Sequence, residues 1–318
     1  MKAIVAVKPG DSFDHWHHIT CRQFSMTECS KAAERNFRAR VTIRQFGELA
    51  LNSIWSSTRH DEVIRVTRRQ VDIRKDQRDC FMLWLMLAGT AGLHQDGRYA
   101  YLRSGDLVIQ DQSRPFDLEL GQLSHAAMVM IPRPLLTSRL PFAGSLAARR
   151  IPAGARTGPI AGSLVQHLFQ VEDATEEAFD RRLSASALDF LSVMLEAEVG
   201  QQSSNDRQGR RLDEVKGYML ARMQDCDLDV QNIAQRMSMA PRTLYRLFAR
   251  ESSTPIQWLW EQRLTASYRL LSEGRSVRVT EVAMNCGFKD VSHFSKAFRT
   301  KFGQSPSSLV RASAIRFD

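Results

Sequence analysis

Two stretches near the C-terminal end carry cationic and polar side chains at helical spacing. In each, apolar residues at i, i+3 and i+4 define one helix face and leave the other residues pointing outward. The outward residues of the first stretch are Arg242, Thr243, Tyr245, Arg246 and Arg250. Those of the second are Val291, Ser292, His293, Ser295, Lys296 and Arg299. Arginine, lysine and small polar side chains suit phosphates and base edges, so both faces are predicted to contact DNA.

The two stretches belong to a repeated unit of two helices and a turn. A short helix from Val230 to about Met237 precedes the first stretch, and its Ile233-Ala234 pair recurs as Val282-Ala283. The inward faces also correspond, with Leu244, Leu247 and Phe248 in one copy and Phe294, Ala297 and Phe298 in the other. Such a repeat doubles one supersecondary unit, here a helix-turn-helix.

A single helix over Pro255–Ser272 is predicted to connect the two units. If it is rigid, it would hold the outward-facing helices about 34 Å apart, which is one turn of DNA. One chain could then occupy two successive major grooves.

Local sequence signals mark the ends of these helices. Pro241 opens the first outward-facing helix, where its missing N–H costs nothing. Asp290 is a candidate N-cap for the second, and Gly287 suits a left-handed turn with Phe288 filling the core. Ala240 has no side chain that could cap the helix it precedes.

Charge is concentrated in the same part of the chain. Residues 206–318 contain 19 Lys and Arg against 12 Asp and Glu, whereas residues 1–205 contain 25 against 23. A local excess of positive charge favours a polyanionic partner, although an ordinary solvated surface would account for the charge alone.

Cysteine usage and apolar runs indicate a cytoplasmic protein without a membrane segment. The five cysteines have no C-x-x-C pair, which argues against a disulfide framework and a zinc finger. The apolar start from Met1 to Val7 is too short for an export signal. The longest apolar run, Phe81 to Ala88, is too short to span a bilayer and predicts a buried strand.

The first two thirds of the chain predict an antiparallel sheet followed by helices. Alternating residues and turn signals such as Asp96-Gly97 fill residues 36–132 and are typical of a sandwich or barrel. The period becomes helical near Gly158, and a long amphipathic helix is expected over Glu176–Glu198. That helix would pack on its own domain or form a dimer seam. The polar segment 200–205 is expected to be a linker, which divides the chain into domains 1–205 and 206–318.

The second unit resembles a known family in detail. Cys286-Gly287-Phe288-Lys289-Asp290-x-Ser292-x-Phe294-Ser295-Lys296-Ala297-Phe298-Arg299, followed by Phe302-Gly303-x-Ser305-Pro306, resembles the pattern of AraC/XylS-type transcriptional regulators. The resemblance covers residues 210–312, with one departure, since members commonly carry Ser where this chain has Ala240. Gly97-Arg98-x-x-x-Leu102-Arg103-x-Gly105-Asp106 and Asp14-x-Trp16 resemble the N-terminal part of the XylS-like branch.

The resemblance implies an α+β multidomain fold. Its N-terminal domain would be a cupin-like antiparallel β-barrel with helices that senses an effector and dimerises, and its C-terminal domain an all-α double helix-turn-helix. The implied function is a sequence-specific DNA-binding regulator, an activator of catabolic genes that responds to a small and plausibly aromatic effector. Its implied partners are promoter DNA, RNA polymerase and a second copy of the chain.

The sequence offers weaker candidates for an effector pocket. Arg44, Trp55, His60 and Trp84 could line it, and each could equally serve the core or the surface. Within the apolar run, the lining could be Phe81, Leu83, Leu85 and Leu87 or the alternate face Met82, Trp84 and Met86.

No cofactor, metal or catalytic residue is predicted. The run His15-Trp16-His17-His18 invites a metal site, but a cupin metal site needs His-x-His and a Glu within one strand and a distant His on another. The predicted strands offer only the isolated His94 and His125. Two alternatives remain open: a cupin enzyme fused to a DNA-targeting domain, and a constitutive regulator whose barrel only dimerises.

Overall fold

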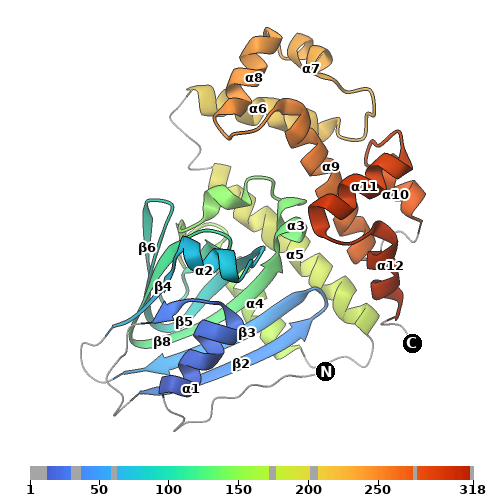
Figure 1. The fold of residues 1–318 in the computed structure, drawn as a ribbon. Coiled ribbons are helices and arrows are strands. Elements are labelled where there is room, and N and C mark those ends of the chain that lie inside the picture. The colour runs from blue at the N-terminus through green and yellow to red at the C-terminus, as the bar shows by residue number, and fades with distance from the viewer. Residues whose placement is uncertain are drawn as a thin grey trace. The chain divides into compact units, whose positions relative to one another are not determined.

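The structure, a computed structural model, describes residues 13–29, 37–58, 63–171, 177–200, 207–274 and 278–315. The chain forms two compact units (Figure 1). The sheet unit comprises Met1–Leu136 and Phe142–Val199, and the helical unit comprises Thr137–Pro141 and Gly200–Asp318. The predicted linker, apart from Gly200, lies outside the described residues.

The described part of the sheet unit contains nine strands, with helices before, between and after them. Its strands are β1 (Glu28–Cys29), β2 (Arg38–Phe46), β3 (Leu49–Ser57), β4 (Ile64–Arg68), β5 (Cys80–Gln95), β6 (Arg98–Arg103), β7 (Leu107–Asp111), β8 (Phe116–Pro132) and β9 (Arg150–Ile151). Its helices are α1 (Phe13–His18), the π-helix η1 (Ile19–Phe24), α2 (Gln70–Lys75), α3 (Arg133–Thr137), the 3₁₀-helix η3 (Ala143–Leu146), α4 (Gly158–Gln170) and α5 (Glu177–Gly200).

Two long strands, β5 and β8, organise the sheet. They pair with each other from Cys80↔Pro132 to His94↔Asp117. The other edge of β8 pairs with β4 and then β3, while the other edge of β5 pairs with β7 and then β6. The register shifts at Met86/Ala88 and Gly89/Ala91 bend this pair. Gly89 has a φ of +75°, and a Cβ there would lie 1.8 Å from the Leu123 carbonyl oxygen, so only glycine fits the bend.

The sheet is antiparallel as predicted, but it does not close into the predicted barrel. The strand order is β1-β4-β8-β5-β7-β9, and the terminal strands β1 and β9 are not paired with each other in the described part of the chain. Each of these strands has only two residues, too few for a continuous ladder between the ends of the sheet. The bend nevertheless lets strands from both halves share one core, which joins Met82 and Trp84 to Leu118 and Leu120.

One edge of the sheet is formed by β2, which pairs only with β3 among the described strands. Its residues alternate as the pleat requires. Ala39 and Val41 are buried, while Arg38, Arg40 and Thr42 are exposed.

Helix α5 packs on its own unit through one face. Leu188, Leu191 and Leu195 are fully buried. Phe179, Phe190 and Val193 are 50–61% exposed and form a second apolar surface on the same helix. The structure thus confirms that α5 packs on its own domain, and it leaves these three apolar side chains exposed.

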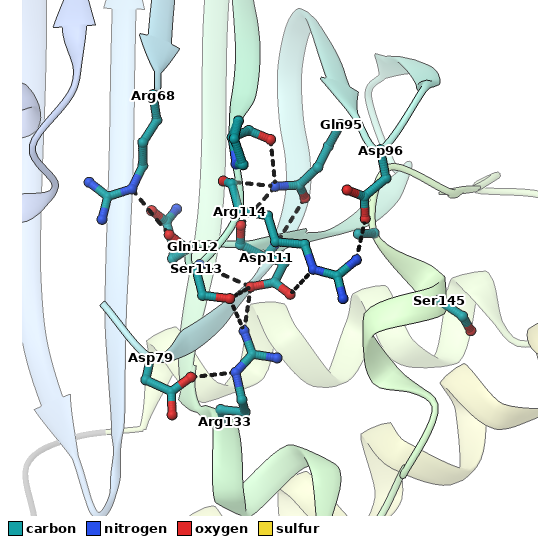
Figure 2. Close-up of polar contacts among 12 residues, drawn as sticks. Arg68, Asp79, Gln95, Asp96, Asp111, Gln112, Ser113, Arg114, Arg133 and Ser145 are labelled. Carbon is teal, nitrogen blue, oxygen red and sulfur yellow. Dashed lines mark hydrogen bonds and ion pairs between the residues drawn. The ribbon is translucent and has the colours of Figure 1, made fainter. Parts of the chain in front are cut away.

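A buried polar network holds the corner between β7 and β8 (Figure 2). Asp111 is fully buried and accepts hydrogen bonds from Arg133 and from the hydroxyl of Ser113, the latter at 2.7 Å. Arg114 adds an ion pair at 3.5 Å. The Gln95 amide donates to the Asp111 carbonyl oxygen at 2.7 Å and accepts from its backbone N–H at 2.9 Å. Because a buried charge needs partners, this network ties the corner to the end of β5.

The helical unit is built along one central helix, α9 (Pro255–Ser272), whose ends agree with the prediction. It carries α6 (Arg207–Ala221), α7 (Val230–Arg236) and α8 (Pro241–Ala249) on its first half, and α10 (Val279–Asn285), α11 (Val291–Phe302) and α12 (Pro306–Ile315) on its second (Figure 1). Each half has a separate apolar core, one around Leu244 and Phe248 and the other around Phe294 and Phe298.

A buried arginine joins the two halves. Arg263 lies near the middle of α9, and its guanidinium donates to the carbonyl oxygens of Met223 at 2.9 Å and Asp225 at 2.6 Å. Gly287, at the end of α10, packs on the same group with a φ of +82°. A Cβ at Gly287 would lie 2.5 Å from the Met223 carbonyl oxygen and 2.9 Å from Arg263 Nε. The left-handed glycine predicted from sequence is therefore also a site of close approach.

We expect Gly287→Ala to destabilise the helical unit more than Gly303→Ala does. Both glycines have positive φ, so each substitution costs roughly 1–2 kcal/mol for the left-handed backbone. A Cβ at Gly303 meets nothing within 4 Å, whereas one at Gly287 clashes with backbone. Urea denaturation of the full chain measures the difference, and equal losses would contradict the close approach.

Candidate nucleic-acid interface and ligand cavity

The first helix-turn-helix unit consists of α7 and α8. The Asp229 side chain caps α7 by accepting the Asn232 N–H at 2.8 Å. Ser238 forms the turn with a φ of +50°. Helix α8 then begins at Pro241 without a side-chain cap from Ala240, as predicted. Leu244 and Phe248 are fully buried, which fixes the rotation of α8 about its axis.

This rotation exposes most of the predicted DNA-contacting residues of α8. Arg242, Tyr245, Arg246 and Arg250 are exposed, and Thr243 is half-buried. The helix therefore presents three guanidinium groups and one phenol on its outer side.

The second unit consists of α10 and α11, and its outward-facing helix is capped. The Asp290 carboxylate accepts the N–H groups of Ser292 at 2.7 Å and His293 at 2.9 Å. These backbone hydrogen bonds, first that from His293, lower the pKa of Asp290 below its usual value. The cap predicted from sequence is thus confirmed.

The outward residues of α11 divide into two groups. Ser292, His293, Lys296 and Arg299 are exposed. Val291 and Ser295 are half-buried, because Val291 packs on the second core and the Ser295 hydroxyl donates to the Val291 carbonyl oxygen at 2.8 Å.

His293 also has a neighbour within the protein. Its ring lies edge-on to Trp260 of α9, with ring centroids 5.0 Å apart. A change at His293 would therefore alter packing as well as any contact with DNA.

Sequence reasoning missed a groove beside α8. Arg210 and Arg211 of α6 line it together with Ser238, Thr243 and Arg246, and its volume is about 720 Å³. Arg211 donates to the Met237 carbonyl oxygen and forms an ion pair with Glu214 at 2.7 Å. The two adjacent arginines were the available signal, but they precede the repeated unit and were not part of its pattern.

The core of the sheet unit contains a cavity of about 60 Å³. Its apolar lining comes from both halves of the bent sheet and includes Met82, Trp84, Val66, Phe116, Leu118, Leu120, Ala126 and Met128. Trp16, Thr20 and Cys21, from α1 and η1, complete the wall. The alternate face of the apolar run, Met82 and Trp84, thus lines the cavity, and the lining includes no Asp, Glu, His, Lys or Arg side chain.

Two buried donors in the cavity wall have no hydrogen-bond partner among the residues that the structure describes. The Trp84 indole N–H donates to Gln110 Oε1 at 2.9 Å, which directs the Gln110 amide nitrogen elsewhere. That nitrogen, Gln110 Nε2, and the indole nitrogen of Trp16 are both buried and unpaired. An unpaired buried donor costs roughly 1–3 kcal/mol, so both groups favour a ligand that brings an acceptor.

Arg44 and Trp55, two of the other predicted effector residues, do not line this cavity. Arg44 donates to the carbonyl oxygens of Leu168 and Val171 at the end of α4. Trp55 neighbours the cavity-lining Ile54 on β3, so its side chain points to the opposite face. His60 lies outside the described residues.

Sequence reasoning missed Gln110 and the role of Trp16. A signal for Gln110 was present, because Gln110 interrupts the apolar start of strand β7. Trp16 was singled out only through a family pattern, since no periodicity places α1 against a sheet.

The two strand histidines, His94 and His125, have different environments. His94 is exposed, whereas His125 is half-buried and lies 3.1 Å from the Ser53 hydroxyl. Burial, with the charge of Arg40, lowers the pKa of His125. Among the described residues, no three His, Cys, Asp or Glu side chains are grouped to hold a metal ion. No described helix is long and apolar enough to cross a membrane.

Comparisons with known proteins agree with both units. Residues 16–196 match the family described as AraC-binding-like domain, and residues 233–312 match the one described as Helix-turn-helix domain. The chain is 28% identical to the transcriptional activator NphR of Rhodococcus sp over 86% of this chain and 80% of that protein. It is 27% identical to the transcriptional activator RhrA of Rhizobium meliloti (strain 1021) over 53% of this chain and 52% of RhrA.

A solved structure has the same fold. The AraC-like transcriptional activator CuxR matches with a TM-score of 0.51 and 14% identity, over 80% of this chain and 91% of CuxR. Since the AraC-binding-like match alone spans more than half of the chain, and the helix-turn-helix match follows it, this protein belongs to the AraC family of DNA-binding transcriptional regulators.

Proposed function

We propose that this protein is an effector-responsive transcriptional activator of catabolic genes that binds promoter DNA as a homodimer. The observation that carries the proposal is the pair of cationic outer faces on α8 and α11, both fixed to one central helix. Activation is inferred from the relatives NphR and RhrA, which are both described as activators.

Residues 206–318 serve as the DNA-binding domain in this proposal. Arg242, Arg246 and Arg250 on α8 and Lys296 and Arg299 on α11 would contact phosphates or base edges. Arg210 would extend the contact from the groove beside α8. RNA polymerase is the partner through which a bound activator would act. A regulator that binds promoter DNA would work in the cytoplasm, where we propose this protein is located.

Residues 1–205 would sense the effector through the cavity. Its lining is mostly apolar, has no carboxylate, imidazole, ammonium or guanidinium group, and offers two buried donors without a partner among the described residues. Such a site suits a small neutral compound that carries a hydrogen-bond acceptor, such as an aromatic aldehyde or amide. The cavity is smaller than the ~150 Å³ space that holds benzene, so an aromatic ligand requires side chains to move. Met82 and Met128 are unbranched and can do so.

A catalytic role is the weaker alternative. The cavity is lined by indole, thiol, hydroxyl, amide and apolar groups, with no carboxylate or imidazole among them to act as an acid or base. A constitutive regulator remains the second alternative, and a ligand-binding experiment separates it from the proposal.

We expect Arg246→Ala to weaken binding to the specific promoter by roughly 1–3 kcal/mol while changing nonspecific binding less. Lys301→Ala, which removes an exposed cation predicted to lie off the groove-facing side of α11, should have little effect. Gel-shift titrations at several salt concentrations test this, and affinity should fall steeply with salt. Equal losses for both variants would show that the facing of α8 is wrong.

We expect Trp16→Phe to reduce effector affinity, because it removes an unpaired donor but keeps an aromatic ring. A ligand identified by thermal shift from aromatic aldehydes, amides and acids should stabilise the wild-type protein by mass action. Trp55→Phe, outside the cavity, is the matched control. Neutral compounds should bind better than anions; a panel without any ligand, or equal effects of the two variants, would count against this cavity as the effector site.

We expect Phe190→Asp to convert a dimer into a monomer. Phe190 lies on the exposed apolar surface of α5, and a carboxylate there would be costly to bury in an interface. Tyr99→Asp changes a similarly exposed aromatic residue on β6 and should leave the dimer intact. Sedimentation at matched concentrations measures both, and a monomeric wild type or an unchanged Phe190→Asp dimer would exclude this interface.

A further inference from the structure

Two cysteines of the sheet unit lie together at the wall of the cavity. Cys21 belongs to the π-helix η1 and is buried, and Cys29 belongs to the edge strand β1 and is half-buried. The segment between them folds back, because the Thr27 N–H donates to the Cys21 carbonyl oxygen at 3.1 Å. Cys29 packs against the same buried core to which Cys21 belongs, and a side-chain hydrogen bond between the two thiols shifts their pKa values in opposite directions. Cys21 itself lines the cavity.

We propose that Cys21 and Cys29 form a peroxide-sensitive thiol pair that closes to an intramolecular disulfide beside the cavity. This proposal is independent of the effector and of DNA binding. It rests on the juxtaposition of two thiols, on the cavity that reaches one of them, and on the different environments of the two sulfur atoms.

Cys21 is suited to act as the nucleophile. The hydrogen bond from Cys29 lowers the pKa of Cys21 to about 7, against the opposing effect of burial, and the Thr27 side chain and Arg22 act in the same direction. A large fraction is therefore thiolate at neutral pH, and the thiolate is the form that attacks an oxidant. A hydroperoxide as small as hydrogen peroxide fits a cavity of about 60 Å³.

Cys29 is suited to act as the resolving thiol. Its hydrogen bond to Cys21, burial and the Cys21 charge together raise its pKa well above the ordinary thiol range, so it stays protonated while Cys21 is a thiolate. When Cys21 becomes a neutral sulfenic acid, that charge disappears. The pKa of Cys29 then falls, and the second step can follow.

The chemistry balances with a hydroperoxide as the only oxidant. The Cys21 thiolate attacks one peroxide oxygen, the O–O bond breaks, and hydroxide leaves as Cys21 becomes a sulfenic acid. Cys29 then attacks the Cys21 sulfur, the S–O bond breaks, and water leaves with the Cys29 proton. The two thiols lose two electrons and two protons, and hydrogen peroxide is reduced to two water molecules.

The other cysteines provide internal controls. Burial raises the pKa of both Cys80 and Cys286 to about 11, so neither should react. Cys226 is exposed and would be the first to react if access alone decided the rate. Oxidation of buried Cys21 ahead of exposed Cys226 therefore distinguishes an activated thiol from an accessible one.

The test uses the reduced full-length protein with one molar equivalent of hydrogen peroxide. After N-ethylmaleimide blocks the remaining thiols, trypsin cleaves at Arg22, between the two cysteines. The expected product in a non-reducing digest is peptide 3–22 linked to peptide 23–31, with Cys226 still blocked by maleimide. Unreacted Cys21, a Cys21 sulfenic acid without the link, or a link through any other cysteine would overturn the proposal.

Two variants separate activation from simple proximity. In Cys29→Ala, Cys21 should stop at the sulfenic acid, which dimedone traps, whereas Cys226→Ala should still form the link. The pH profile of Cys21 alkylation by iodoacetamide should have its midpoint near 7 in the wild type and at higher pH in Cys29→Ala. The same midpoint in both proteins would show that Cys29 does not activate Cys21.

Discussion

The pairing of Arg263 with the carbonyl groups of Met223 and Asp225 sets the geometry of the helical unit. A guanidinium buried in the middle of α9 has to be hydrogen-bonded, and its partners lie in the loop that leads into the first helix-turn-helix. Gly287, from the second helix-turn-helix, closes over the same group. One side chain thus holds both helix-turn-helix motifs to α9. The spacing of α8 and α11, the helices proposed to contact DNA, therefore depends on an interaction within the protein.

In the sheet unit the governing feature is a bend. The cavity forms because β5 and β8 bend together. Gly89 allows β5 to turn against β8, so that apolar faces from both halves of the sheet enclose a space with two unpaired donors. A ligand there can influence DNA binding only by favouring one arrangement of the protein over another. Because α1 and η1 form part of the wall, they are the elements whose position a ligand would affect directly.

Helix ends and turns were predictable from the sequence, whereas the contacts between residues far apart in the chain were not. Pro255, Ser272, Gly287 and Asp290 mark turns and helix ends through their own backbone or side-chain preferences, and the structure places them as predicted. For Phe81–Met86, the alternation of residues along a strand did not decide which of its two faces lines the cavity, because both faces are apolar. The hydrogen bonds of Arg44 and Gln110 were unpredictable for a similar reason. Their partners lie far away in the sequence, and only the folded arrangement of strands and helices brings them together.

The exposed arginines of β2, Arg38 and Arg40, affect whether the sheets of two molecules can pair along this edge. A nine-residue edge strand offers unpaired backbone groups on which a second sheet could grow, the usual start of aggregation. Two copies aligned along this edge would bring the exposed Arg38 and Arg40 of each close together. Their mutual repulsion would oppose such pairing of sheets, and salt would weaken that repulsion by screening the charges.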